Sequence, residues 1–186
     1  MTMVSRYHPL LVLLHWILAG LLIAALALGA LVMAKIPKIE ALRAHMLGGT
    51  LILVLMLARL VVRFRTSHPA AASAGHPLLD GLAWTSHRLL YLVALGMPIT
   101  GLILALQSNL PWIVFGGETM PADFWVFSFR SVHYAFSRML MVLIALHVAG
   151  ALYHALLLRD GLLGRMFFGR RVVAAKDARR DAQARS

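Results

Sequence analysis

Residues 133–154, HYAFSRMLMVLIALHVAGALYH, decide how the rest of the chain is interpreted. His133, His147 and His154 follow one another at intervals of 14 and 7 residues, in a segment made largely of apolar side chains. At about 100° per residue these intervals are nearly whole helical turns, so the three imidazoles share one helix face. His133 and His147 would stand roughly 21 Å apart along the axis, too far to share one metal ion. The spacing instead predicts one end of each of two stacked cofactors.

The composition indicates a membrane protein. Of the 186 residues 61% are hydrophobic and 13% are charged, which lies outside the range of soluble globular domains. Four apolar segments are each long enough, or nearly so, to cross about 30 Å of hydrocarbon as a helix. We therefore predict an all-α fold, an integral membrane four-helix bundle over residues 1–170, followed by a basic tail at 171–186. The predicted helices cover about 9–34, 39–63, 81–107 and 131–158.

The net charge of +11 is explained by membrane topology. Four spans place both termini on one side of the membrane, and that side collects thirteen of the eighteen Lys and Arg residues. The positive-inside rule then puts both termini in the cytoplasm. We expect contact with membrane lipid and none with nucleic acid.

Depth in the membrane sorts the histidines into pairs. His45 begins the second helix at the outer level of His133, and His15 lies on the first helix at the level of His147. Two histidines from different helices of a bundle are a typical ligand set for a b-type haem. The chain has no cysteine, which excludes the covalent attachment of a c-type haem. Two pairs at two depths predict two haems b between the helices, with iron held by His15, His45, His133 and His147.

Alternatives remain for these histidines. A lone histidine in a span is more often a packed polar residue, but four at matched depths favour haem. A haem-free metal transporter is the remaining chemical alternative, although transport sites usually bring carboxylates into the membrane. In this chain every acidic residue falls in a loop or at a helix end.

Other polar residues near the cytoplasmic ends of the spans have open roles. Arg59 lies fourteen residues after His45 and shares its face, which predicts a part in cofactor binding; snorkelling to the cytoplasmic surface is an equal competitor. His87 and His154 form a third level. They could be a substitute ligand pair, a proton-handling pair beside a quinone, or ordinary interfacial residues.

Several motifs together resemble those of the bacterial dihaem cytochrome b561 family. They extend over nearly the whole chain, from about Tyr7 to Arg171, and include more than the histidines. The matching stretches are LLHW at 13–16, RAHMLGG at 43–49, LVLMLARLVVR at 53–63, SHRLLYLVALGMPITGL at 86–102, NLPWIVFGGETMP at 109–121 and the pair His133 and His147 followed by LYH.

The resemblance implies a multi-pass cytochrome of the bacterial inner membrane. Like the short stand-alone members, it would oxidise superoxide at the periplasmic side and pass electrons to ubiquinone, with no partner protein required. The resemblance assigns His45 and His133 to the periplasmic haem, and His15 and His147 to the haem on the cytoplasmic side. It also implies a ubiquinone pocket, whose candidate residues are His87, Arg88 and His154.

Basic residues surround the expected periplasmic haem. A positively charged surface around this haem would speed the capture of superoxide, a small anion. Pairing with haem propionates or lipid is the alternative role of these residues. The steering candidates are Lys35, Lys38, Arg43, Arg130 and Arg138.

A second function shares the same haem pattern. A cytochrome b subunit that relays electrons between a periplasmic hydrogenase or dehydrogenase and quinone would also need two histidine pairs. The histidines alone do not separate these functions.

Overall fold

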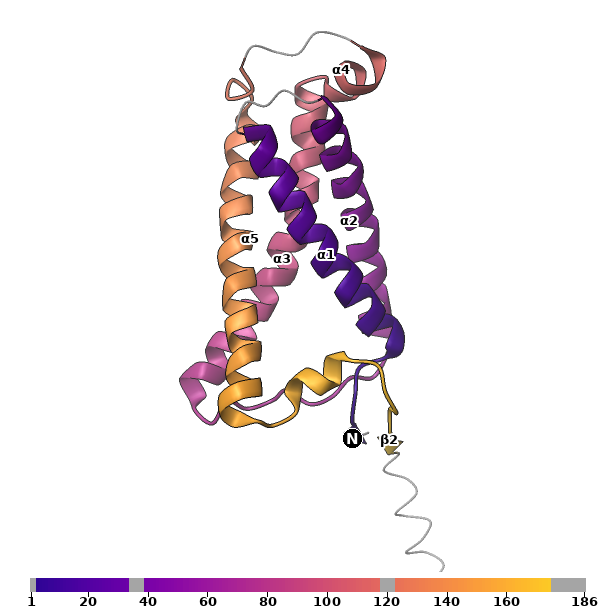
Figure 1. The fold of residues 1–186 in the computed structure, drawn as a ribbon, viewed down its shortest axis with the longest axis vertical. Coiled ribbons are helices and arrows are strands. Elements are labelled where there is room, and N and C mark those ends of the chain that lie inside the picture. The colour runs from indigo at the N-terminus through magenta and orange to yellow at the C-terminus, as the bar shows by residue number, and fades with distance from the viewer. Residues whose placement is uncertain (1–2, 34–38, 118–122, 175–186) are drawn as a thin grey trace, which may run out of the picture.

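The structure is a computed structural model that describes residues 3–33, 39–117 and 123–174. Four long helices cross the length of the molecule (Figure 1), and each contains an apolar stretch long enough to span a membrane. This all-helical bundle confirms the predicted fold class. The long helices are α1 (Pro9–Met33), α2 (Ile39–Arg65), α3 (Pro77–Gln107) and α5 (Ser128–Tyr153), which continues into the π-helical turn η1 (His154–Leu158).

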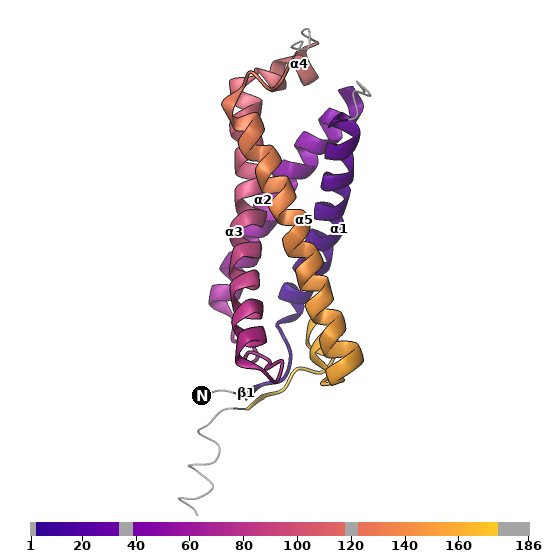
Figure 2. The ribbon, with the colours of Figure 1, turned by 90° about the vertical axis from the view of Figure 1, so that its left-hand side faces the viewer.

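The bundle is built from two helical hairpins. Helix α1 packs along α2, α3 packs along α5, and contacts between α2 and α3 join the two hairpins. Figure 2 shows the four helices running side by side, with the short helix α4 (Leu110–Gly116) across one end. We call this end the α4 side, and the opposite end, which carries the N-terminus, the terminal side. Side chains that point from one hairpin to the other meet inside the bundle.

A core cluster occupies the middle of the bundle and draws on all four long helices. Leu140 of α5 is only 1% exposed and lies halfway in sequence between His133 and His147. Apolar side chains from α1, α2 and α3 surround it, which buries hydrocarbon away from both ends of the bundle. The buried members are Leu18, Ile52, Met56, Val93, Ala94, Leu140 and Leu143.

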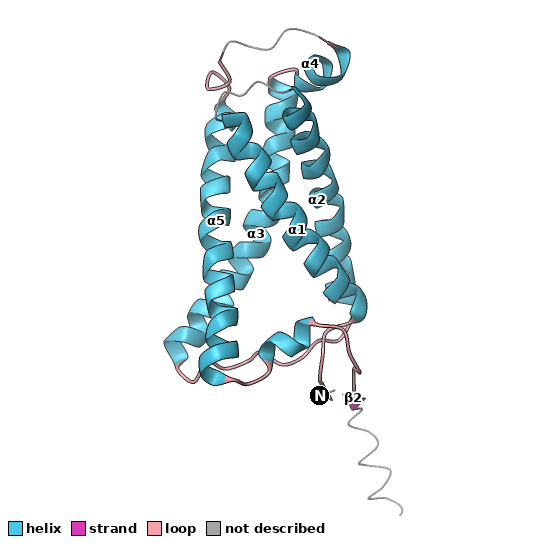
Figure 3. Ribbon diagram, viewed as in Figure 1, coloured by secondary structure: helices cyan, strands magenta, loops and turns pink. Residues whose placement is uncertain are grey.

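The α4 side is more regular than the sequence predicted. The predicted helices leave residues 108–130 outside any helix, but α4 folds within this stretch and α5 begins at Ser128 (Figure 3). Pro111 suits a first helical turn because its missing N–H leaves no bond unmade. Leu110, Ile113 and Val114 share one face of α4 and are buried against α2 and α3. Nη2 of Arg43 donates to the carbonyl of Val114 at 2.8 Å, which fastens α4 to the start of α2.

Helix α3 begins four residues before the predicted start at residue 81. Pro77 opens the helix, and Nδ1 of His76 accepts a hydrogen bond from the N–H of Leu78 at 3.2 Å. Histidine is not among the residues that usually mark a helix start, so the sequence pattern missed this cap.

Described segments from near both ends of the chain meet at the terminal side. Strand β1 (Met3–Val4) pairs antiparallel with β2 (Val173–Ala174), and the short 3-10 helix η2 (Leu162–Met166) lies beneath the bundle. Nη1 of Arg6 donates to the carbonyl of Gly164 at 2.5 Å, and Nε of Arg171 donates to the carbonyl of Arg6 at 3.0 Å. Residues 171–174, the start of the predicted basic tail, therefore pack against the N-terminal segment, and the rest of that tail lies outside the described residues.

Candidate haem-binding sites

His45 and His133 face each other at the α4 side and form what we call the α4-side pair. His45 comes from α2 and His133 from α5, so the pair bridges the two hairpins. Their ring centroids are 6.1 Å apart and their planes meet at 89°. Two imidazoles bonded to one metal ion at about 2 Å each have ring centroids about 6 Å apart. The separation therefore fits one metal ion between the two rings.

Hydrogen bonds hold both rings in the tautomer that metal ligation needs. Nδ1 of His45 lies 3.0 Å from the carbonyl of Ala25, which can only accept, so this nitrogen carries the hydrogen. Nδ1 of His133 lies 3.0 Å from the hydroxyl of Thr100, whose own hydrogen goes to the carbonyl of Met97 at 2.8 Å. Nδ1 of His133 is therefore a donor as well. In both rings Nε2 is left as the lone-pair atom that can bind a metal.

Two glycines let these rings approach neighbouring helices. A Cβ atom at Gly29 of α1 would lie 3.3 Å from Cε1 of His45, and one at Gly101 of α3 would lie 2.9 Å from Cε1 of His133. The second distance is too short for any side chain without displacement of the ring. Sequence reasoning missed both glycines and Thr100, because the helix that faces each histidine is known only from the fold.

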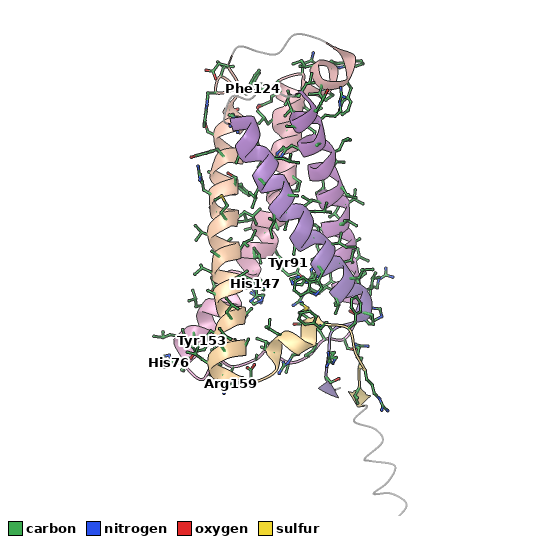
Figure 4. The ribbon with its side chains drawn as sticks, in the orientation of Figure 1. His76, Tyr91, Phe124, His147, Tyr153 and Arg159 are labelled. Atoms are coloured by element: carbon green, nitrogen blue, oxygen red, sulfur yellow. The ribbon has the colours of Figure 1, made fainter. Side chains whose placement is uncertain are left out.

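The terminal-side pair, His15 of α1 and His147 of α5, repeats this arrangement. The ring centroids are again 6.1 Å apart, with an interplanar angle of 76°. Figure 4 shows His147 on the side of α5 that faces α1. These two residues also bridge the hairpins, and the core around Leu140 separates them from the α4-side pair. The structure thus contains two histidine pairs of equal spacing at two depths.

A third ring joins the terminal-side pair. The centroid of His87 lies 5.1 Å from that of His147, and Nδ1 of His87 donates to the carbonyl of Ala83 at 2.8 Å. The sequence grouped His87 with His154, whereas the structure places it against His147. Periodicity within one helix does not show which side chains of a neighbouring helix its residues contact, so the contact between His87 and His147 could not be predicted.

Arg59 is buried inside the bundle, with 8% of its surface exposed. Nη1 donates to the carbonyl of Leu11 at 2.7 Å and Nε donates to the hydroxyl of Tyr91 at 3.1 Å. Its charge acts on both His15 and His147. The side chain therefore points into the bundle, and the snorkelling alternative does not describe its position.

His154 has a carboxylate partner that sequence reasoning missed. The residue is 7% exposed and its Nδ1 lies 2.6 Å from Oδ2 of Asp160, just beyond the π-helical turn. The hydrogen bond from His154, followed by one from the N–H of Leu162, holds the pKa of Asp160 below its ordinary value of 3.8. Arg88 is exposed and stacks over Trp84, with the guanidinium carbon 3.6 Å from the ring centroid.

The basic residues of the α4 side differ in what they contact. The charge of Arg130 acts on both histidines of the α4-side pair. Arg43 is engaged with α4, and Arg138 is exposed and donates to the hydroxyl of Tyr134 at 2.9 Å. Arg130 is therefore the described steering candidate most closely coupled to the site. The remaining candidates, Lys35 and Lys38, lie outside the described residues.

Comparison with known proteins gives the family. Residues 6–169 match the family model described as prokaryotic cytochrome b561. The chain belongs to this family. As a prokaryotic cytochrome b561 it is a multi-pass membrane cytochrome of electron transport, and haem b is the cofactor that membership implies. The resemblance seen in the sequence is confirmed.

Two curated relatives of this cytochrome b561 are moderately similar in sequence. The probable superoxide oxidase CybB of Yersinia pestis is 31% identical over 126 residues, which cover 66% of this chain and 72% of that protein. The cytochrome b561 homolog 1 of Escherichia coli (strain K12) is 26% identical over 173 residues, which cover 87% of this chain and 97% of that protein.

The donor set of this cytochrome b561 fits b-type haem. Each pair supplies two opposed imidazoles at a spacing that suits one iron, and the α4-side rings both leave Nε2 for the metal. Within residues 3–33, 39–117 and 123–174, no group of three or more His, Cys, Asp or Glu residues is arranged to hold a metal ion.

Proposed function

We propose that this cytochrome b561 oxidises superoxide on one side of the membrane and reduces ubiquinone on the other. The observation that carries the proposal is the pair of equally spaced histidine clamps at two depths, one on each side of the apolar core. His45 and His133 would hold one haem b, and His15 and His147 a second. Bound haem supplies one-electron redox chemistry, which neither substrate can obtain from side chains alone. The name of the Yersinia pestis relative supports superoxide as the electron donor.

The overall reaction balances with these two substrates. Two superoxide anions each lose one electron and leave as dioxygen, while one ubiquinone gains two electrons and takes up two protons. The residues of the chain hold the ligand rings, keep water out of the middle of the bundle and supply charge at each end. The apolar cluster around Leu140 serves the second of these roles, since it presents no polar side chain to water.

We assign the α4 side to the periplasm and the terminal side to the cytoplasm. The excess of Lys and Arg at the terminal side supports this orientation through the positive-inside rule. Arg130 would then attract superoxide from the periplasm, because its positive charge is close to both histidines of the α4-side pair.

We place ubiquinone reduction at the terminal side, where the second histidine pair lies. There the buried His154 donates a hydrogen bond to the exposed Asp160, a histidine and carboxylate pair of the kind that can pass protons between solvent and the bundle. His87 and Arg88 belong to the same end of α3. These residues support a quinone site that takes up protons from the cytoplasm.

Stopped-flow mixing of superoxide with the oxidised, purified protein tests the proposal. We expect superoxide to produce the absorption band of a reduced b-type cytochrome, and added ubiquinone to remove the band again. Dithionite serves as the control, because it reduces bound haem whatever the physiological donor is. A protein that dithionite reduces and superoxide does not would overturn the proposal, and activity that appeared only with an added dehydrogenase would favour the relay function.

A further inference from the structure

Arg59 is a buried cation without an acidic neighbour in the described parts of the chain. Its hydrogen bonds go to two neutral groups, the carbonyl of Leu11 and the hydroxyl of Tyr91. Among the described residues no carboxylate oxygen lies within 4.0 Å of its guanidinium nitrogens. An uncompensated charge inside a membrane span is costly, so its presence indicates a functional use.

The position of Arg59 makes the electrostatic potential at the two histidine pairs different. Its hydrogen bond to the carbonyl of Leu11 holds it close to His15, and its charge acts on His15 and His147. On α2, Ile52 and Met56 of the apolar core lie between Arg59 and His45. The α4-side pair is instead near Arg130, which is partly exposed close to the start of α5. Water and salt screen a charge near the surface, whereas a buried charge acts through a medium of low dielectric constant. The terminal-side pair therefore experiences the stronger positive field.

The hydrogen bonds of Arg59 keep this charge in place. Leu11 belongs to α1, one turn before His15, and Tyr91 belongs to α3. Arg59 thus connects three helices through its two bonds. The nearby Arg63 also lies over the ring of Tyr91, with its guanidinium carbon 5.6 Å from the centroid. Arg63 lies one turn further along α2 and is more exposed than Arg59, so water screens its charge more strongly, which makes it a matched control.

We propose that Arg59 sets the direction of electron flow by raising the reduction potential of the cofactor at the terminal-side pair. The inference rests on the proposed haem ligation by the two pairs. Adding an electron adds negative charge, which a fixed positive charge stabilises, so the centre beside Arg59 has the higher potential. Electrons that enter at the α4 side are therefore drawn toward the terminal side, where the proposed quinone site lies.

Spectroelectrochemical titration of the purified protein tests this role separately from activity. Wild type should show two steps of reduction. Arg59→Gln should lower the higher midpoint potential and leave the lower one in place, while Arg59→Lys should keep most of the wild-type value. Arg63→Gln should change neither. An unmoved higher potential in Arg59→Gln, or an equal fall in Arg59→Lys, would overturn the inference.

Tyr91→Phe provides a milder variant that keeps the charge and removes one hydrogen bond. Both potentials should stay near their wild-type values, because the remaining hydrogen bond to the carbonyl of Leu11 still holds the charge near His15. A fall as large as that in Arg59→Gln would show that the charge is not the cause. The titration also separates this inference from the proposed function. Absence of haem from the wild type would contradict the proposed function. Two bound haems whose reduction potentials do not change in Arg59→Gln would contradict the inference alone.

Discussion

The ring of His133 lies at right angles to that of His45, with the two centroids 6.1 Å apart across the interface between the helical hairpins. The Nδ1 atoms of both rings are engaged by neighbouring groups, which leaves both Nε2 atoms for a metal ion. The terminal-side pair has the same centroid spacing. Two similar clamps on either side of one apolar core are the structural basis of the proposed electron path.

Gly101→Ala should weaken the α4-side site. A Cβ atom at this position would lie 2.9 Å from Cε1 of His133, so the added methyl group must displace the ring. We expect the haem content per chain to fall by up to half, as measured from the reduced spectrum and the protein concentration. Gly81→Ala is the matched control on the same helix, because nothing lies within 4 Å of the position of its added Cβ. Equal haem content in the two variants would contradict the expected packing.

The long helices and the paired histidines could be predicted because they depend on local properties of the chain. The length of each apolar segment identifies a span, and the interval of 14 residues between His133 and His147 places both rings on one helix face. The start of α3 was less predictable because His76 supplies an unusual cap. Helix α4 was missed because a short amphipathic turn in an aromatic stretch resembles an interfacial loop.

The contacts between helices could not be predicted from the sequence, for a different physical reason. Hydrophobic periodicity gives the buried face of a helix, but it does not say which neighbour covers that face. Thr100 and Gly101 therefore gave no sign that they contact His133. The contact between His154 and Asp160 depends on the π-helical turn between them, and no residue pattern predicted this turn.

Acid should weaken the protein partly through Asp160. Hydrogen bonds from His154 and Leu162 hold the pKa of Asp160 below its ordinary value of 3.8 in the folded state. Its contribution to stability is therefore fully present above that ordinary value and is lost as the pH falls through the lower folded-state pKa. We expect Asp160→Asn to be less stable than wild type at neutral pH and to lose less stability on acidification.

Thermal unfolding in detergent from about pH 6 to about pH 3 checks the Asp160 prediction. Asp123→Asn is a control with the same change of charge, since Asp123 accepts a backbone hydrogen bond from Trp125 but has no histidine partner among the described residues. Parallel loss of stability in wild type and Asp160→Asn over this range would show that the contact with His154 contributes little.

Arg130→Gln should slow the reduction of the cytochrome by superoxide. Arg130 acts on both histidines of the α4-side pair, so removing its charge lowers the attraction of an anion toward that site. We expect the bimolecular rate constant to fall roughly threefold at low salt, with a smaller difference at high salt because of screening. Arg138→Gln should have a smaller effect, since Arg138 is exposed and held by Tyr134. Similar rates for wild type and Arg130→Gln at low salt would rule out steering by this residue.

The number of haem b groups per chain tests the central claim most directly. Extraction of haem from the purified protein, with quantification as the pyridine haemochrome, should give two per chain for wild type. One should remain in His133→Ala and one in His15→Ala, whereas His87→Ala should retain both, because His87 is the third ring of the terminal-side cluster and not part of the pair at 6.1 Å. A haem-free wild type, or loss of a haem in His87→Ala while His15→Ala keeps both, would contradict the assignment.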